Sequence, residues 1–413
     1  MNFAAVNLGC KVNHVELEEF SAAALGHGFR LSTQTDADLI LINTCTVTGE
    51  AERKTRKAVN RALAANDHAT VLLTGCSVAI NPDYYEALSP RVLVLGKPQV
   101  PTYLEELAST PAYAHEAAQA ETGVSGTSPF RTRSGIRVQD GCDNACTYCI
   151  VHTARGHAVS LPREGILSQA ITLLEGGTRE IVLTGINLGS YHDERGGLAP
   201  LLEDLLALTD RYAYATRFRL SSIEPADIDD DLIALMAREA GRVCRHVHIP
   251  LQSGSSKVLA EMNRHYTAED FANLVSRLRS AMPNISLSTD IIVGFPGETE
   301  ADFAQTLALS RACAFSKIHV FPYSMRAGTP AAARTDQIPP QVKQARAKEL
   351  RALSDELRAA DYAARVGTAE LVLAEGNGYG MTESYHHIPV PASIAAGELV
   401  PLVLPVIECF TEA

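Results

Sequence analysis

Short apolar runs alternate with longer helix-like segments along most of this chain of 413 residues. In the N-terminal quarter the runs are rich in valine, isoleucine and leucine, as buried strands are. They lie at 3–8, 39–42, 71–73 and 92–95, and the segments 12–28 and 50–65 have the pattern of helices. Because strands and helices alternate, we expect an α/β fold with a parallel sheet covered by helices on its faces.

A cysteine directly follows each of the first three predicted strands: Cys10, Cys45 and Cys76. Ligands of open α/β sheets bind beyond the carboxyl ends of the strands, so we expect the three thiols to converge. A single cysteine there is most often a small buried apolar residue, but three in matching positions favour a shared site. The start of the chain has no signal-peptide pattern, and nine cysteines in a reducing compartment favour metal binding or catalysis over disulfides.

A second strand–helix series begins near residue 136. Its helices include 162–175 and 268–281, and its six predicted strands are 136–139, 180–183, 217–220, 247–249, 287–293 and 317–321. Six units fall short of the eight of a complete (β/α) barrel, which predicts an open, partial (β/α)6 barrel. A charged helix at 341–365 follows, and the short apolar runs at 370–374, 388–390 and 399–406 predict a small all-β region.

Composition suggests where these parts are joined. Residues 108–134 are rich in serine, threonine, glycine and proline, which is typical of a linker. We therefore expect four parts: an N-terminal domain at 1–107, the linker at 108–134, the barrel domain at 135–365 and the small β domain at 366–413.

The most specific motif is the C-x3-C-x2-C spacing of Cys142, Cys146 and Cys149, directly after the first barrel strand. Structural zinc normally takes four ligands, and only His152 offers itself as a fourth, in a Cys3His site. Three thiolates on one loop favour instead a 4Fe-4S cluster with one open iron. Such an iron can chelate the amino and carboxylate groups of S-adenosylmethionine and pass an electron into its sulfonium.

This motif and several others resemble those of the radical-SAM methylthiotransferases over nearly the whole chain. Within that family, the segments 8–13, 183–189 and 319–324 are similar to the MtaB-type branch, which acts on threonylcarbamoyladenosine next to the anticodon of tRNA. The segments that carry the resemblance are 7–13, 42–48, 138–156, 183–189, 251–255, 290–299 and 321–324.

The resemblance implies two 4Fe-4S clusters and S-adenosylmethionine as cofactors. Cys142, Cys146 and Cys149 match the ligands of the radical-generating cluster. Cys10, Cys45 and Cys76 match the ligands of an auxiliary cluster whose open iron carries the sulfur to be transferred. One S-adenosylmethionine would methylate that sulfur, and a second would supply the radical that takes hydrogen from C2 of the adenine. The C-terminal part would correspond to the family's TRAM-like β domain.

Polar residues at the carboxyl ends of barrel strands are candidates for the cofactor pocket. By similarity, Glu224 or Gln252 would lie near the ribose or the methionine moiety of S-adenosylmethionine. Any of these side chains could instead cap a turn or bond a backbone group. The full candidate set is Tyr148, Gly185, Asn187, Ser222, Glu224, Gln252 and Asp290.

A net charge of −12 argues mildly against a nucleic-acid binder, but basic residues gather locally. The part after Arg365 contains no lysine or arginine and six glutamates, so we expect tRNA contacts elsewhere. The candidates are Arg53, Lys54, Arg56, Lys57 and Arg61, then Arg131, Arg133, Arg137 and Arg155, and finally Lys343, Arg346, Lys348 and Arg351.

Other functions stay open at this point. Within the family, the substrate could be isopentenyladenosine in tRNA or a ribosomal-protein aspartate. Outside it, the chain could be a non-catalytic iron–sulfur protein that binds RNA, or a zinc-dependent RNA-binding module. No apolar run reaches transmembrane length, so we expect a cytoplasmic enzyme without a membrane partner. We further expect a monomer served by a flavodoxin-like or ferredoxin-like reductant and by a sulfur donor.

Overall fold

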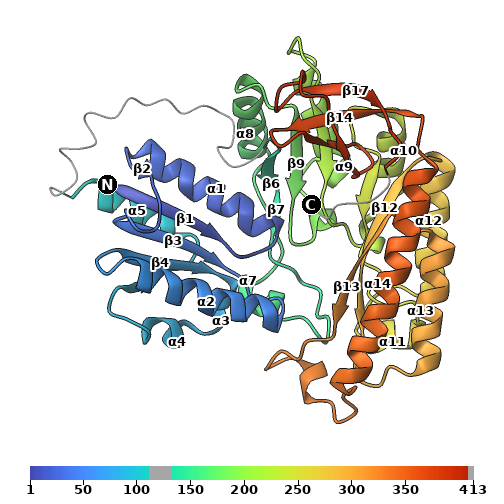
Figure 1. Ribbon diagram of the computed structural model, residues 1–413, viewed down its shortest axis with the longest axis horizontal. Coiled ribbons are helices and arrows are strands. Elements are labelled where there is room, and N and C mark those ends of the chain that lie inside the picture. The colour runs from blue at the N-terminus through green and yellow to red at the C-terminus, as the bar shows by residue number, and fades with distance from the viewer. Residues whose placement is uncertain (111–131, 408–413) are drawn as a thin grey trace. The chain divides into compact units, whose positions relative to one another are not determined.

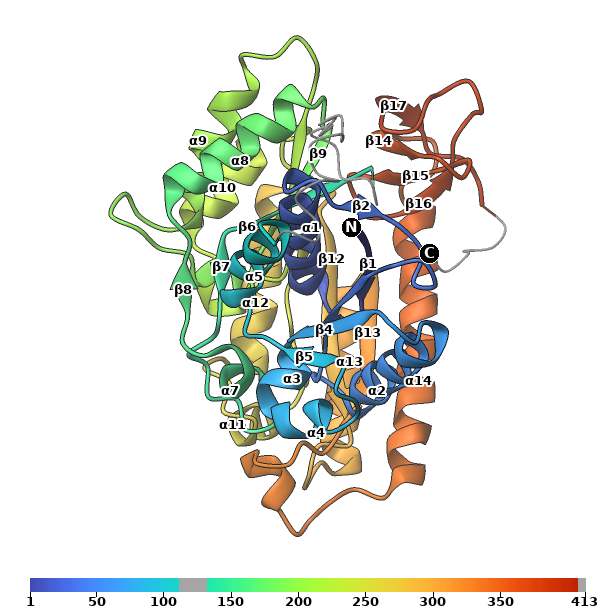
Figure 2. The same ribbon diagram turned by 90° about the vertical axis from the view of Figure 1, so that its left-hand side faces the viewer.

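The computed structural model describes residues 1–110 and 132–407, and these form two compact units. The first contains the N-terminal part together with residues 141–143 and 149–157; the second contains the rest of the described chain. Figures 1 and 2 label many of the elements of both units in two views.

The first unit is built on a five-stranded parallel sheet with the strand order β2-β1-β3-β4-β5. Its strands are β1 (Asn2–Asn7), β2 (Arg30–Leu31), β3 (Leu39–Thr44), β4 (Thr70–Gly75) and β5 (Val92–Val94). Its helices are α1 (Lys11–Gly26), α2 (Gly49–Ala65), α3 (Cys76–Ile80), α4 (Pro82–Glu86), α5 (Gln99–Ala108) and α7 (Val151–Arg155). The predicted parallel sheet is confirmed, with β2 as an additional short edge strand.

Alternate residues of β3 explain why helices cover both faces of this sheet. Leu39 and Leu41 pack with residues of α1 and α5, whereas Ile40 and Ile42 pack with residues of α2. Because side chains of a strand alternate between faces, a strand that is apolar throughout needs a cover on each side. Figure 2 shows α1 and α5 on one side of the sheet and α2, α3 and α4 on the other.

The second unit contains the predicted six parallel barrel strands. They form two sheets, β6-β9-β10 and β11-β12-β13, and the parallel bridge between Ser222 and His248 lies between them. The strands are β6 (Ser134–Arg137), β9 (Glu180–Thr184), β10 (Arg217–Leu220), β11 (His246–His248), β12 (Ser286–Val293) and β13 (Lys317–Pro322). A small antiparallel pair, β7 (Gln139–Asp140) and β8 (Val159–Ser160), stands outside these sheets.

Helices follow the barrel strands and bury the apolar face of the sheet. They are α8 (Arg163–Glu175), α9 (Leu198–Thr209), α10 (Asp230–Arg238), α11 (Ser256–Glu261), α12 (Ala268–Ala281), α13 (Glu300–Cys313) and α14 (Pro340–Ala363). Short 3-10 turns are η1 (Leu188–Ser190), η2 (Pro225–Asp227) and η3 (Pro330–Ala333). Capping boxes at Thr267 and Thr299 explain where α12 and α13 begin. No helix of the described chain is long and apolar enough to cross a membrane.

The C-terminal part of this unit is a four-stranded antiparallel sheet of order β16-β15-β14-β17. Its strands are β14 (Ala369–Glu375), β15 (Tyr379–Thr382), β16 (His387–Pro389) and β17 (Leu399–Val403). The all-β prediction is confirmed, although β15 was not predicted.

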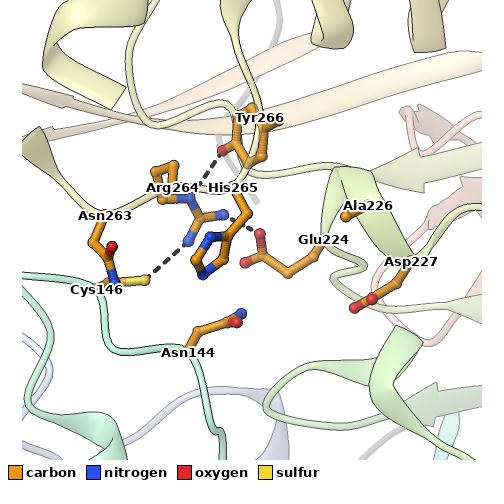
Figure 3. A pocket seen from close by; sticks show the side chains of 9 residues that line it. All are labelled: Asn144, Cys146, Glu224, Ala226, Asp227, Asn263, Arg264, His265 and Tyr266. Carbon is orange, nitrogen blue, oxygen red and sulfur yellow. Dashed lines mark hydrogen bonds and ion pairs between the residues drawn. The ribbon is translucent and has the colours of Figure 1, made fainter. Parts of the chain in front are cut away.

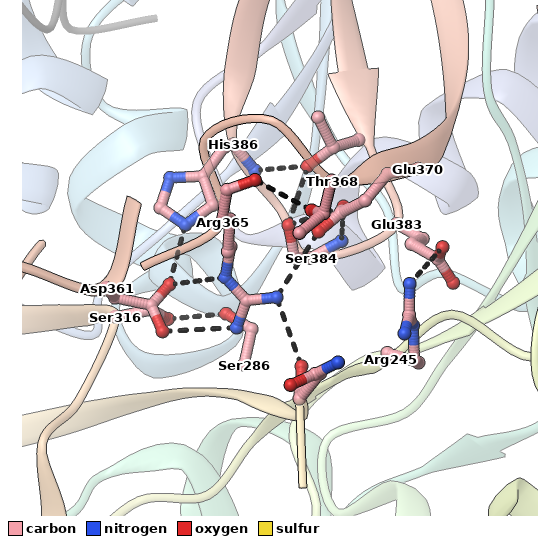
Figure 4. A network of polar contacts seen from close by, with 12 residues as sticks. Arg245, Ser286, Ser316, Asp361, Arg365, Thr368, Glu370, Glu383, Ser384 and His386 are labelled. Atoms are coloured by element: carbon pink, nitrogen blue, oxygen red, sulfur yellow. Dashed lines mark hydrogen bonds and ion pairs between the residues drawn. The ribbon is translucent and has the colours of Figure 1, made fainter. Parts of the chain in front are cut away.

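Arginines of the barrel bind the C-terminal sheet. Arg217 donates to the carbonyl oxygens of Leu371 and Met381 at 2.6 and 2.8 Å, and its neighbour Arg219 donates to that of Thr382 at 2.9 Å. Arg245 pairs with Glu383 at 2.8 Å. In the same region Glu370 pairs with Arg365 (Figure 4). Two glutamates of the C-terminal sheet region are therefore structural partners of arginines.

Candidate metal centres and cofactor pocket

The first cysteine triplet lies at the carboxyl end of the parallel sheet, as predicted. Cys10 precedes α1, Cys45 follows β3, and Cys76 begins α3 after β4. Burial raises the pKa of Cys45 to about 11, and the neighbouring thiols of Cys10 and Cys76 act in the same direction. The parallel register aligns the ends of the three strands, because Asn7 pairs with Asn43 and Thr44 with Gly75. The three cysteines therefore follow neighbouring strand ends at one edge of the sheet.

Two asparagines of the same sequence motifs connect the loops that carry these cysteines. Asn13 Nδ2 donates to Asn43 Oδ1 and to the carbonyl oxygen of Thr44, both at 3.0 Å. Asn43 Nδ2 donates in return to the carbonyl oxygen of Asn13 at 2.8 Å. The thiol of Cys10 donates to Asn13 Oδ1 at 3.2 Å. Because both asparagines are buried, these bonds hold the Cys10 and Cys45 loops in a defined relative position.

A buried ion network borders the same triplet. Arg155 Nε donates to Cys76 Sγ at 3.2 Å, and its guanidinium also pairs with Glu16 at 2.9 Å. Lys97 pairs with Glu16 at 2.6 Å. Although burial opposes ionisation, the two cations hold the pKa of Glu16 below its ordinary value. The sequence analysis did not predict Glu16 or Lys97 as site residues. Its assignment of Arg155 to tRNA contact was wrong, because that side chain is 1% exposed and offers no charge to RNA.

The second triplet occupies the loop between β7 and α7. The backbone N–H of Val151 donates to Cys149 Sγ at 3.4 Å, and that of Cys142 donates to the carbonyl oxygen of Gly156 at 3.1 Å. Cys142 and Cys149 belong to the first unit and Cys146 to the second. In the second unit, Cys146 Sγ accepts a hydrogen bond from Arg264 Nη1 at 3.2 Å.

A pocket in the second unit surrounds this contact (Figure 3). Arg264 forms an ion pair with Glu224 and donates to the hydroxyl of Tyr266 at 3.1 Å. Burial raises the pKa of Glu224, which outweighs the opposing effect of Arg264. The pocket brings together two of the predicted residues, Cys146 and Glu224, and its lining consists of Asn144, Cys146, Glu224, Ala226, Asp227, Asn263, Arg264, His265 and Tyr266. Sequence reasoning missed Arg264, because nothing in its surroundings distinguishes it from a surface arginine.

Asn187 extends the polar surroundings of this pocket. Its Nδ2 donates to Asp227 Oδ2 at 2.7 Å, and its backbone N–H donates to Gln139 Oε1 at 3.0 Å. Its Oδ1 is buried and has no hydrogen-bond partner among the described residues. A buried acceptor of this kind suits a donor from a bound molecule, such as an amino group. Gly185 lies in the same loop, where a Cβ would come within 3.0 Å of Gln139 Oε1.

The remaining candidates lie outside the lining of that pocket. Gln252 adopts φ +64°, and its backbone bridges to Ile291 of β12. Ser222 bridges to His248, and Asp290 lies 3.3 Å from that histidine. Tyr148 packs against a separate apolar cluster that includes Phe295 and Tyr323.

Comparisons with known proteins identify the family of this chain. Residues 136–310 match the Radical SAM superfamily, and residues 2–96 match the uncharacterized protein family UPF0004. The chain is 37% identical to threonylcarbamoyladenosine tRNA methylthiotransferase MtaB of Bacillus subtilis, over 91% of this chain and 85% of that protein. The chain belongs to the radical-SAM methylthiotransferases.

Another relative within this methylthiotransferase family has a different named product. The chain is 35% identical to tRNA-2-methylthio-N(6)-dimethylallyladenosine synthase of Carboxydothermus hydrogenoformans, over 84% of this chain and 82% of that protein. Among solved structures, the radical S-adenosylmethionine methyltransferase TsrM of Kitasatospora setae is similar with a TM-score of 0.58 and 14% identity. That match covers 80% of this chain and 77% of TsrM, and it supports the fold.

The residues present suit the iron–sulfur clusters that this methylthiotransferase family implies. None of the six candidate cysteines forms a disulfide within the described residues. Cys76, Cys146 and Cys149 each accept an N–H bond at sulfur, a contact that tunes such clusters. Cys244 and Cys313 are buried and free, and Cys313 lies in the barrel core. Cys409 lies outside the described residues.

The structure revises the predicted RNA-contacting residues of this methylthiotransferase. Arg346 is buried and pairs with Glu298 at 2.6 Å, so its assignment to RNA was wrong. Arg133 pairs with Glu375 and Arg137 with Asp140, while Arg131 lies outside the described residues. Exposed basic side chains do remain on α2, where Lys54, Lys57 and Arg61 share one face because they follow helical spacing. None of these three takes part in an ion pair within the described chain.

Proposed function

We propose that this protein transfers a methylthio group to C2 of the adenine in N6-threonylcarbamoyladenosine, next to the anticodon of tRNA. The observation that carries the proposal is the presence of two separate cysteine triplets, each with a buried arginine on one of its sulfurs. The printed substrate of the Bacillus subtilis relative supports the choice of nucleoside.

We assign cluster-binding and cofactor-binding roles to residues of this chain. Cys142, Cys146 and Cys149 hold one 4Fe-4S cluster, and Cys10, Cys45 and Cys76 hold the other. When bound, the first cluster with S-adenosylmethionine supplies a deoxyadenosyl radical, and the second carries sulfur. Glu224, Asp227 and Asn187 offer acceptors for the amino and hydroxyl groups of the cofactor near Cys146. Tyr148, Gly185, Ser222, Gln252 and Asp290 complete the proposed cofactor-binding set.

The proposed organisation follows the four parts expected from the sequence. We assign 1–107 to the auxiliary-cluster domain, 108–134 to a linker, 135–365 to the radical-SAM barrel and 366–413 to a TRAM-like domain. Further partners are tRNA, a flavodoxin-like or ferredoxin-like reductant and a sulfur donor. The enzyme acts as a cytoplasmic monomer in this proposal.

Two measurements test the reaction. The protein is purified without oxygen and reconstituted, and deoxyadenosine is measured after reduction in the presence of S-adenosylmethionine and tRNA. We expect deoxyadenosine together with about eight irons per chain, since each cubane cluster holds about four. A protein that binds zinc, or iron without releasing deoxyadenosine, contradicts the proposal in favour of a non-catalytic RNA-binding role.

The second candidate substrate is dimethylallyladenosine (isopentenyladenosine), which the Carboxydothermus hydrogenoformans relative favours. Nucleoside mass spectrometry of tRNA from a deletion strain separates the two. Loss of the methylthio form of threonylcarbamoyladenosine supports the first proposal, and loss of the methylthio form of isopentenyladenosine supports the second.

A further inference from the structure

Arg155 follows the C-x3-C-x2-C loop in the sequence but contacts the other cysteine triplet. It ends α7, six residues after Cys149, and belongs to the first unit together with that cysteine. Its Nε lies 3.2 Å from Cys76 Sγ. A short segment thus carries a sulfur of one triplet and a cationic partner of the other.

The other nitrogens of the guanidinium are also engaged. Nη1 donates to Glu16 Oε1 and Nη2 to Asn13 Oδ1, both at 2.9 Å. Asn13 Oδ1 is the atom that also accepts from Cys10 Sγ. The guanidinium therefore borders Cys76 directly and Cys10 through Asn13. Its planar fork is fixed on several sides, which a flexible surface arginine would not be.

The charges of this network complement those of a three-thiolate cluster. Arg155 and Lys97 bring two positive charges to this network, and Glu16 brings a negative charge that opposes them. Three thiolates with an oxidised cubane core of charge 2+ carry a net charge of about −1, and one added electron brings it to about −2. Because opposite charges attract more strongly in a buried site, a fixed cation stabilises the reduced cluster more than the oxidised one.

We propose that Arg155 is a positioning residue that raises the reduction potential of the cluster held by Cys10, Cys45 and Cys76, and that Glu16 orients it and opposes its charge. The inference rests on the proposed cluster at this triplet. It extends that proposal by naming the residues that set the electron affinity of the auxiliary site.

The test uses the full chain with Cys142, Cys146 and Cys149 replaced by alanine, so that only the first triplet binds a cluster. The midpoint potential of the remaining cluster is measured by redox titration followed by electron paramagnetic resonance. Arg155→Gln should lower the midpoint because it removes the cation. Arg155→Lys should shift it less, since the charge remains. Glu16→Gln should raise the midpoint, because a negative charge is lost.

Opposite shifts in Arg155→Gln and Glu16→Gln distinguish an electrostatic role from a merely structural one, which would move both variants in the same direction. Arg53→Gln, an exposed arginine of the same unit, serves as the control and should leave the midpoint unchanged. If Arg155→Gln binds no iron, Arg155→Lys and Glu16→Gln still provide the comparison. Unchanged or equally directed midpoints overturn the inference, whereas absence of any cluster in the otherwise unaltered triplet contradicts the proposed function itself.

Discussion

A side chain at residue 75 would occupy space that Asn43 already fills, because a Cβ on Gly75 would lie 2.3 Å from Asn43 Oδ1. Gly75 also adopts φ +97°, which L-residues rarely do. Gly75→Ala should lower the free energy of unfolding by about 1–3 kcal/mol through backbone strain, and it should displace Cys76. Urea denaturation and iron content measure both effects. Gly26→Ala is the matched control, since nothing lies within 4 Å of its Cβ.

Each cysteine triplet should account for half of the bound iron. Cys76→Ala should reduce iron from about eight to about four per chain, because only one cubane loses a ligand. Cys313→Ala, in the barrel core, should keep all the iron while costing some stability. Inductively coupled plasma mass spectrometry gives the counts. Loss of all iron in Cys76→Ala would mean that the two sites do not fill independently.

The Glu224–Arg264 pair predicts strong coupling between two substitutions. Arg264→Gln leaves the buried carboxylate of Glu224 without its cation, which should cost about 3–5 kcal/mol of stability. The double variant Glu224→Gln with Arg264→Gln should cost less than the sum of the single variants, since no charge is then left unpaired. A double-mutant cycle of urea denaturation measures the coupling. Additive costs would show that the pair contributes little.

The exposed face of α2 predicts where salt-dependent tRNA binding originates. Replacing Lys54, Lys57 and Arg61 by glutamine should reduce the slope of log affinity against log salt by about 2 to 3, at roughly 0.7–0.9 per lost phosphate contact. The control is the double variant Arg53→Gln with Arg56→Gln on the same helix, because these arginines already pair with Glu50 and Glu52. Filter binding over a salt series measures the slope. An equal effect of the control double variant would argue against this face.

Asp361 makes the junction of barrel and C-terminal sheet sensitive to acid. Burial opposes its ionisation, but hydrogen bonds from His386 and Arg365 hold its pKa below the ordinary value. A lowered folded pKa stabilises the protein above the unfolded value of about 3.9, and this contribution is lost as the pH falls through the folded pKa. Asp361→Asn should therefore destabilise the apoprotein more at pH 7 than at pH 3. Asp67→Asn should show a much smaller difference, because solvent screens the exposed hydrogen bond from His68 that lowers the pKa of Asp67.

Local patterns predicted the strands well, because the apolar run of a buried strand is visible in neighbouring residues. Apolar runs located all six barrel strands, and the strand ends that they predict in the N-terminal part directly precede Cys10, Cys45 and Cys76. Two of the missed strands, Arg30–Leu31 and Tyr379–Thr382, lack such a run: the first has two exposed residues, and the second contains a glycine.

The partners of the triplets could not be read from the sequence in the same way. Arg155 and Glu16 are 139 residues apart, and no local pattern joins them. A buried arginine and an exposed one also look alike in sequence, which explains the wrong assignments of Arg155 and Arg346 to RNA. What distinguishes them is the tertiary position of a carboxylate, which only the folded chain supplies.

The arginines that bind the C-terminal sheet have a consequence for how that sheet can be studied. Arg217 and Arg219 are almost completely buried, and carbonyl oxygens of residues 371–383 satisfy their outer nitrogens. A chain cut after residue 366 would expose the guanidinium groups of Arg217 and Arg219 on β10. Among the contacts described, Glu180 would then be their sole neutralising partner. Such a truncation would report on barrel integrity rather than on RNA binding. In this protein the C-terminal sheet is a structural part of the barrel unit and not an independent module.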